Sequence, residues 1–274
     1  MYKIFYQSSL PRAGSTLLQN IIGQNPEFYV TPTSGLYSLV NNTRTFLDKS
    51  PEFKAQDEAV MNDCWKSFCK AGMHEFYTPV TNKPYILDKS RNWQTSVNLL
   101  EYIHDEVPKI ICMLRNPKDI LASMEKNFNR NPAEKERLLK MVANVGDTPN
   151  KRLSIYSQTS PILPAMKSLF ENVRVGIDSK ILFVKFEDLC VNPNLELARI
   201  YQYLELPYFQ HDFSNIEQIT KEDDEIYGIF GDHIIRPKLE PVISKAEELF
   251  GKGGLEWIYE KYDWFYTRFN YIKE

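Results

Sequence analysis

Cysteines, long hydrophobic runs and an excess of positive charge are all scarce in this sequence, and each absence excludes a class of protein. The cysteines, Cys64, Cys69, Cys112 and Cys190, have no metal-ligand spacing, so we expect reduced structural thiols and no metal site. No segment approaches the roughly 18 apolar residues of a membrane span, and no signal-peptide pattern precedes the first apolar run. A net charge of -3 leaves no basic surplus for nucleic acid. We therefore expect a cytoplasmic protein without a membrane span or a nucleic-acid partner.

A chain of 274 residues that is 43% hydrophobic can bury one substantial core, so we predict a single domain over residues 1–274. Apolar runs alternate with helical periodicities along it, which predicts an α/β fold of three layers with a central parallel sheet. The predicted strands are Lys3–Gln7, Tyr85–Asp88, Lys109–Leu114 and Ile181–Lys185, and the predicted helices are Ser15–Gly23, Gln94–Val107, Ile120–Asn129 and Leu195–Leu204, with a polar helical stretch over Gly35–Gly72.

Two further regions differ in their patterning. Residues 126–172 have mixed charge, several prolines and no strong period, so we expect an irregular insertion there. Near the C-terminus, a stripe of large apolar residues recurs at spacings of four and three, which predicts one helix with its apolar face in the core. The stripe consists of Ile258, Tyr262, Phe265, Phe269 and Ile272.

Residues 4–22 predict a strand, a phosphate-binding loop and a helix N-terminus. Gly14 lets the backbone approach an anion, Ser15 and Thr16 add hydroxyl donors, and the first-turn N–H groups point at the anion. The loop is not a Walker A motif, because no Gly-Lys-Ser/Thr closes it and its cation, Arg12, precedes the glycine. Taken alone, the segment is also compatible with an ordinary strand, turn and helix with a surface arginine.

A second segment, residues 108–124, predicts a buried strand that ends at Arg115 and a helix that begins near Pro117. Asp119 adds a favourable negative charge near the helix N-terminus, and Ser123 lies about two turns after Arg115. An arginine at a strand end and a serine on the next helix can converge on one phosphate outside the sheet edge. The sequence thus indicates two anion sites, each at the carboxyl end of a strand.

Together these segments resemble the sulfotransferases that use 3′-phosphoadenosine 5′-phosphosulfate (PAPS). Residues 11–16 resemble that family's Pro-Lys/Arg-Ser-Gly-Ser/Thr-Thr loop, with Ala13 in place of the usual Ser or Thr. Arg115 and Ser123 match its pair for the 3′-phosphate, eight residues apart. Residues 184–189, followed by Pro193 and residues 200–207, resemble its strand-and-helix unit of the form YEDL…P…FLGLP. The resemblance covers most of the chain.

The resemblance implies a P-loop nucleotide-hydrolase-like fold with helical insertions that cover the substrate. It also implies an enzyme that moves a sulfuryl group from PAPS to a hydroxyl or amine by in-line displacement and releases 3′-phosphoadenosine 5′-phosphate (PAP). Because negative charge grows on the bridging oxygen, we expect Arg12 to neutralise the leaving phosphate. The implied donor-binding residues are Arg12, Ala13, Gly14, Ser15, Thr16 and Leu17, with Arg115 and Ser123 at the 3′-phosphate.

Two other functions remain open from the sequence. A P-loop nucleotide kinase or other phosphotransferase shares the strand, loop and helix, although the Gly-Lys-Ser/Thr ending is absent. A non-catalytic protein that binds PAP or PAPS could keep both phosphate sites and lack a base. A weaker likeness, residues 227–233, resembles the Gly-rich loop with which family members close over the 3′-phosphate and adenine. It adds Tyr227 and Gly228 as candidate donor-binding residues, with Arg236 as a candidate replacement for the missing Arg-Lys pair.

The general base is not at either of the family's usual places. The Lys-Thr-His segment after the second strand corresponds to Lys89-Ser90-Arg91, and residues 30–35, where other members carry a glutamate, hold no carboxylate. The resemblance implies that Lys89 is a second cation near the transferring group. The candidate bases are Asp88, His74, His233 and His104, of which His104 is favoured as a packing residue. An acidic acceptor that needs no strong base is a further alternative.

The acceptor is left open by the sequence. Small molecules, carbohydrates, lipids and peptides all serve as acceptors in this family. The insertion at residues 126–172 is expected to cover the acceptor site, and Tyr37, Phe46, Trp65 and Trp93 are equally compatible with an aromatic pocket and with core packing. The discriminating residues are expected in residues 41–72 and 129–164.

Overall fold

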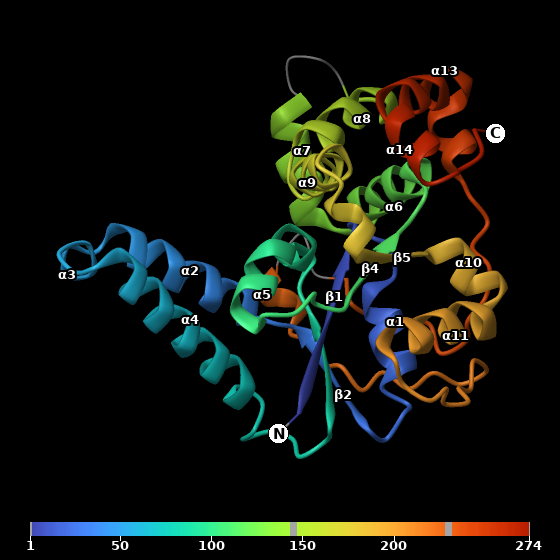
Figure 1. Ribbon diagram of the computed structural model, residues 1–274. Helices are drawn as coiled ribbons and strands as arrows, with labels where there is room; N and C mark the ends of the chain where they lie inside the picture. Colours follow the sequence, from blue (N-terminus) through green and yellow to red (C-terminus); the bar gives the residue numbers. More distant parts are fainter. Residues whose placement is uncertain (1, 143–146, 228–231, 274) are drawn as a thin grey trace.

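The protein folds around one parallel sheet with helices on both faces (Figure 1). The computed structural model describes residues 2–142, 147–227 and 232–273. Within them, five strands pair in the order β2-β3-β1-β4-β5, and every pairing is parallel. The predicted α/β architecture with a central parallel sheet is therefore confirmed.

The strands are β1 (Lys3–Ser9), β2 (Phe28–Thr33), β3 (Tyr85–Lys89), β4 (Ile110–Leu114) and β5 (Ile181–Lys185). The helices are α1 (Ser15–Ile22), α2 (Leu36–Lys49), α3 (Pro51–Lys54), α4 (Glu58–Glu75), α5 (Val97–His104), α6 (Pro117–Arg130), α7 (Pro132–Val142), α8 (Pro149–Gln158), α9 (Ile162–Arg174), α10 (Phe186–Val191), α11 (Pro193–Leu204), α12 (Asp224–Tyr227), α13 (Ala246–Lys261) and α14 (Asp263–Arg268), with 3₁₀ turns η1 (Arg91–Ser96) and η2 (Ile177–Lys180).

The centre of the sheet is buried on both faces. In β1 every residue after Lys3 is buried, and all five residues of β4 are fully buried. This explains why both strands read as nearly continuous apolar runs, because helices cover both faces of a parallel sheet. The registers Gln7↔Lys89 and Ser9↔Met113 bring the carboxyl ends of β1, β3 and β4 to one edge. The connection that follows β1 leads to β2 on one side of the sheet, and the connection that follows β4 leads to β5 on the other side. The point between β1 and β4 where the direction reverses is where α/β folds bind ligands.

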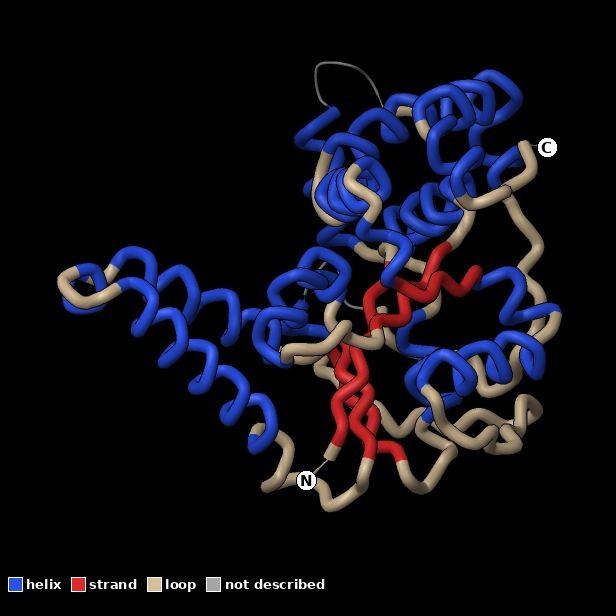
Figure 2. The backbone as a smooth tube through the Cα atoms, in the orientation of Figure 1, coloured by secondary structure: helices blue, strands red, loops and turns tan. Residues whose placement is uncertain are grey.

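The helices are grouped around the sheet (Figures 1 and 2). On one face lie α1, α10 and α11, and on the other lies α5. The hairpin of α2, α3 and α4 projects from the body as an arm, and the helices α6 to α9 gather with α13 and α14 beyond the carboxyl ends of the strands. The described residues contain no helix long and apolar enough to cross a membrane.

Several predicted boundaries were wrong. Strand β2 was not predicted, and residues 91–96 form the 3₁₀ turn η1 before α5 begins at Val97. The region expected to be irregular, residues 126–172, contains the end of α6 and the helices α7, α8 and most of α9. The C-terminal stripe spans α13 and α14, which meet at Tyr262, and its last member, Ile272, is 73% exposed. Its other four members are buried in the core as predicted.

Candidate functional site

The loop between β1 and α1 is tightly wound beneath the helix N-terminus. Gly14 occupies the N-cap position of α1 with φ 80°, and Arg12 also has a positive φ of 59°. A Cβ atom at Gly14 would lie 2.5 Å from the ring of Phe186, so the position excludes any side chain. Ala13 is buried at 1% exposure, and the carbonyl of Ser15 accepts a hydrogen bond from Gln7 (3.0 Å). The loop is thereby fixed with the N-terminus of α1 free to face an anion.

Arg12 lies among several charged and polar side chains at the carboxyl ends of the strands. Its Nε donates to Oγ of Ser123 on α6 (3.0 Å), and its Nη2 forms an ion pair with Oδ2 of Asp232 (2.5 Å). Arg130, at the end of α6, contacts the same carboxylate oxygen at 2.7 Å. Although burial opposes it, the two arginines hold the pKa of Asp232 below its usual value, so a negative charge occupies the position beside Arg12.

Arg115 reaches the same loop from the end of β4. Its Nη1 donates to the carbonyl oxygen of Arg12 (2.8 Å), and its guanidinium stacks 4.8 Å from the centroid of Phe186. Burial lowers the pKa of Arg115, and the nearby Asp119 and Glu187 oppose that shift. Arg115 lines a cavity of about 90 Å³ beside Phe186 and Cys190. Arg115 and Ser123 therefore both contact Arg12, and the two predicted anion-binding motifs meet at one edge.

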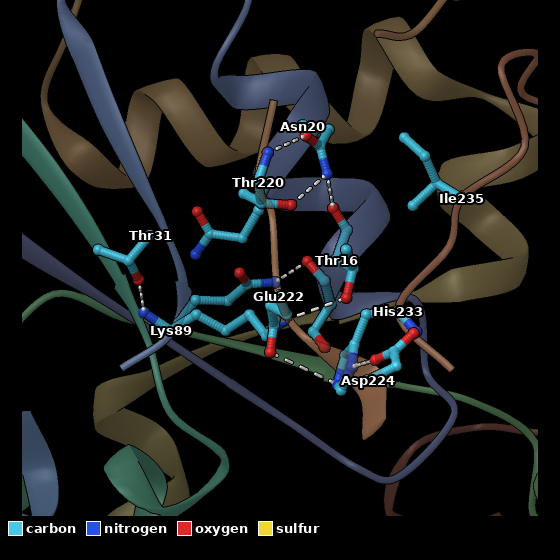
Figure 3. A network of polar contacts seen from close by, with 12 residues as sticks. Thr16, Asn20, Thr31, Lys89, Thr220, Glu222, Asp224, His233 and Ile235 are labelled. Atoms are coloured by element: carbon cyan, nitrogen blue, oxygen red, sulfur yellow. Dashed lines mark hydrogen bonds and ion pairs between the residues drawn. The ribbon is translucent and has the colours of Figure 1, made fainter. Parts of the chain in front are cut away.

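A buried ion pair lies on the opposite flank of the loop (Figure 3). Nζ of Lys89 contacts Oγ1 of Thr16 at 3.1 Å and Oε1 of Glu222 at 2.8 Å. The side chains of Lys89 and Glu222 are 7% and 2% exposed. Burial lowers the pKa of Lys89 and Glu222 partly restores it, while Lys89 overcomes the effect of burial and holds the pKa of Glu222 below its usual value. The lysine predicted to lie near the transferring group is thus in direct contact with the loop.

His233 joins this network from the chain that follows α12. Its Nδ1 lies 2.5 Å from Oδ1 of Asp224, and its Nε2 lies 3.8 Å from Oε2 of Glu222 (Figure 3). With Nδ1–H donated to Asp224, Nε2 carries the free lone pair of the neutral ring. The ring of Tyr227 stands edge-on to the imidazole, with centroids 5.2 Å apart.

The segment that carries Glu222 is anchored to the loop's own helix. Asn20 of α1 accepts hydrogen bonds from the backbone N–H groups of Ile219 (2.7 Å) and Thr220 (3.0 Å) and donates to Oγ1 of Thr220 (2.9 Å). The side chain of Gln218 then donates to the carbonyl of His233 (3.0 Å). Glu222 and His233 are therefore positioned relative to Thr16 by a continuous set of hydrogen bonds.

The other candidate bases lie elsewhere. Asp88 is fully buried on the side of β3 away from Lys89, where its carboxylate accepts hydrogen bonds from Tyr77 and from Nε1 of Trp93 (2.6 Å). Burial raises the pKa of Asp88. It is a structural carboxylate in this arrangement, as expected from the alternation of side chains along a strand.

His74 and His104 lie at the far end of the sheet. Their rings are 5.9 Å apart, and both line a cavity of about 620 Å³ next to Tyr6 and Pro108, at the starts of β1 and β4. Nε2 of His104 lies 2.8 Å from the hydroxyl of Tyr6, and burial lowers the pKa of His104 to about 4. The structure brings neither histidine to the loop, and it supports the packing role predicted for His104.

The remaining predicted donor-binding residues are placed as follows. Leu17 is packed against the core, and Tyr227 ends α12 beside His233. Arg236 is exposed and close enough to lower the pKa of Cys190, a thiol that lines the cavity beside Arg115, although burial raises that pKa overall to about 11. Gly228 lies outside the described residues. In the described ranges there is no cluster of three or more His, Cys, Asp or Glu side chains that could hold a metal ion.

Sequence reasoning missed Glu222, Asp224 and Arg130. The two carboxylates lie in a short charged run, residues 221–225, that contains no motif. The residue before this run, Thr220, is held against α1 by its hydrogen bond to Asn20. Asp232 lies within the Gly-rich segment 227–233, and its contact with Arg12 bridges 220 residues of sequence. A contact of that kind has no local sequence signal.

Comparisons with known proteins bear on the family and on the fold. A model described as the sulfotransferase family matches residues 8–210. Among solved structures, the chain is similar to the sulfotransferase domain from the curacin biosynthetic pathway, with 15% identity, a TM-score of 0.55 and coverage of 96% of this chain and 97% of that one. It is similar to the sulfotransferase domain of the Synechococcus PCC 7002 olefin synthase, with 15% identity, a TM-score of 0.54 and coverage of 96% and 95%. No curated protein matches the sequence significantly.

Proposed function

The chain belongs to the sulfotransferase family, and on that premise we propose that it takes its sulfuryl group from PAPS and releases PAP. The loop from Pro11 to Thr16 and the N-terminus of α1 hold the 5′-phosphosulfate, and Arg115 and Ser123 hold the 3′-phosphate. The observation that carries this proposal is the convergence on Arg12, where Ser123 binds the side chain and Arg115 binds the carbonyl. A nucleotide with anionic groups at its 5′ and 3′ positions matches Arg12 and Arg115, two cationic groups at one edge of the sheet.

The reaction follows from where charge develops. The acceptor oxygen or nitrogen forms a bond to sulfur while the bond between sulfur and the bridging oxygen breaks, and its electron pair stays on the 5′-phosphate of PAP. Arg12 and Lys89 are the cations that neutralise this growing charge, and the first N–H groups of α1 supply donors. The proton of the acceptor passes to Nε2 of His233, which Asp224 holds in the required tautomer.

The acceptor is a hydroxyl or amine group of a small molecule, carbohydrate, lipid or peptide. The helices α6 to α9 stand beyond the carboxyl ends of the strands (Figure 1), which supports a role for residues 126–172 in covering the acceptor. The cysteines in the described part of the chain are free thiols, three of them buried, which supports a reducing, cytoplasmic location.

The test is sulfuryl transfer from [³⁵S]PAPS to a panel of phenols, sugars, lipids and peptides. Transfer to any acceptor by the wild-type protein, with loss in Arg12→Ala, supports the proposal. Binding of PAP, with neither transfer to any member of the panel nor release of sulfate, favours a non-catalytic binding protein. Stabilisation by ATP with Mg²⁺ and not by PAP contradicts the donor assignment.

A further inference from the structure

Glu222 occupies a position that no motif predicts. Oε1 is ion-paired with Lys89, while Oε2 is buried and makes no hydrogen bond of good geometry to the described residues. The hydroxyls of Thr33 and Tyr227 lie near enough to the carboxylate to affect its pKa or their own. A buried carboxylate oxygen without a partner is costly, and such atoms in folded proteins call for an explanation. Nε2 of the His233 ring lies 3.8 Å from this oxygen.

The two oxygens of Glu222 thus face Lys89 and His233, which have different roles in the proposed reaction. Lys89 must carry a positive charge toward the leaving oxygen, and His233 must gain a proton from the acceptor. Between Oε2 and Nε2, 3.8 Å is too long for a direct hydrogen bond. A small movement after proton transfer would create a charge-assisted hydrogen bond from the imidazolium to Oε2.

We propose that Glu222 is a positioning residue shared by Lys89 and His233, aiming the protonated lysine at Thr16 and supplying the counter-charge for the imidazolium that forms during transfer. The proposal rests on the proposed function. It also accounts for residues 30–35, which lack the family's glutamate: the hydroxyl of Thr33 contributes to lowering the pKa of Glu222, so a carboxylate from a distant segment lies beside that stretch.

The charged surroundings determine the sign of the pH effect. Arg91 opposes the proton on Lys89, whereas Glu222 and Asp224 favour it, and burial keeps the pKa of Lys89 below its usual value. Removing the charge of Glu222 lowers the pKa of Lys89 further, so Lys89 becomes neutral at a lower pH. At the other oxygen, loss of the carboxylate removes the negative charge that faces Nε2 of His233 at 3.8 Å, while Asp224 and Tyr227 still contact that ring.

The experiment compares Glu222→Gln with Glu222→Asp, which keeps the charge, and with Glu225→Gln, which removes the charge of an exposed glutamate three residues away. The primary measurement is a pH titration of the imidazole signals by NMR, in a chain with 4 histidines, with His233 assigned from a His233→Gln spectrum. We expect the His233 ring to gain its proton at lower pH in Glu222→Gln and at unchanged pH in Glu225→Gln. An unchanged titration in Glu222→Gln, or an equal shift in the control, overturns the proposal.

The second measurement is kcat and kcat/KM for sulfuryl transfer from [³⁵S]PAPS, with p-nitrophenol and water as probe acceptors. In Glu222→Gln, kcat should fall roughly tenfold or more, the alkaline limb of the profile should move to lower pH, and Glu222→Asp should recover part of the rate. A shifted His233 titration with unchanged kcat refutes the proposed role of Glu222 in the transfer step. If the wild type neither binds PAP nor consumes PAPS, the proposed function fails, while the NMR titration still decides whether Glu222 and His233 are coupled.

Discussion

Asp232 should compete with the nucleotide for Arg12. Its carboxylate contacts Arg12 at 2.5 Å and Arg130 at 2.7 Å, and Arg12 in turn contacts Ser123. An anionic group of the donor that binds Arg12 must therefore replace an existing counter-charge. Replacing that carboxylate with an amide, as in Asp232→Asn, removes the competing charge and keeps the shape of the side chain.

The expected gain follows from the exposure of the two ion pairs. The side chains of Arg12 and Asp232 are 27% and 22% exposed, and Arg130 is 52% exposed. The partly buried pair with Arg12 is worth about 1 kcal/mol and the more exposed pair with Arg130 less. A total of about 1–2 kcal/mol corresponds to PAP binding roughly 5- to 30-fold tighter in Asp232→Asn. Because the arginines hold the pKa of Asp232 below its usual value despite burial, the gain should persist from pH 5 to pH 8.

Isothermal titration calorimetry with PAP measures this directly. Asp223→Asn is the matched control, since it removes the charge of an exposed aspartate outside the Arg12 contact, and its affinity should equal that of the wild type. An unchanged or weaker affinity in Asp232→Asn would show that Asp232 stays in place and helps to orient Arg12. The reasoning about competition would then be wrong.

Three further variants probe the loop and the sheet. Gly14→Ala places a Cβ atom 2.5 Å from the Phe186 ring at φ 80°, so urea titration should show that the free energy of unfolding falls by roughly 2–4 kcal/mol. The control Gly72→Ala, at a helical site with nothing within 4 Å, should leave the free energy of unfolding unchanged or raise it. Arg12→Ala should lower kcat for transfer from PAPS by roughly 100-fold or more while the melting temperature changes little; near-normal turnover would contradict its role. Asp88→Asn should cost about 1–3 kcal/mol of stability and leave PAP affinity, measured by calorimetry, unchanged, and a selective loss of rate without loss of stability would return it to the list of bases.

Strands β1, β3, β4 and β5 were predicted from the sequence, and the edge strand β2 was not. Buried strands such as β1 and β4 appear as unbroken apolar runs because helices cover both faces. Strand β2 contains Pro32, which argues against a central strand, but β2 is at the end of the sheet order, where a proline is tolerated. In residues 126–172, Pro132 and Pro149 suggested breaks, yet each begins a helix, the position where a missing N–H costs nothing.

The residues of the proposed donor site could be predicted from the sequence and those of the proposed proton acceptor could not, for a physical reason. The loop around Arg12 and the pair Arg115 and Ser123 each follow a strand directly, so local sequence fixes their place at the sheet edge. Glu222 and His233 come from irregular chain whose position depends on hydrogen bonds to Asn20. Such long-range contacts carry no periodicity or spacing, which is why the sequence left four candidate bases.

The donor assignment is tested most directly by the affinity of the wild-type protein for PAP and for 5′-AMP, which lacks the 3′-phosphate, measured by calorimetry under one salt condition. Charge-assisted contacts to the 3′-phosphate are worth about 1.5–3 kcal/mol, so PAP should bind roughly 10- to 100-fold more tightly, and Arg115→Ala should abolish most of that preference. Equal affinity for the two nucleotides, or tighter binding of ATP with Mg²⁺ than of PAP, would contradict the account.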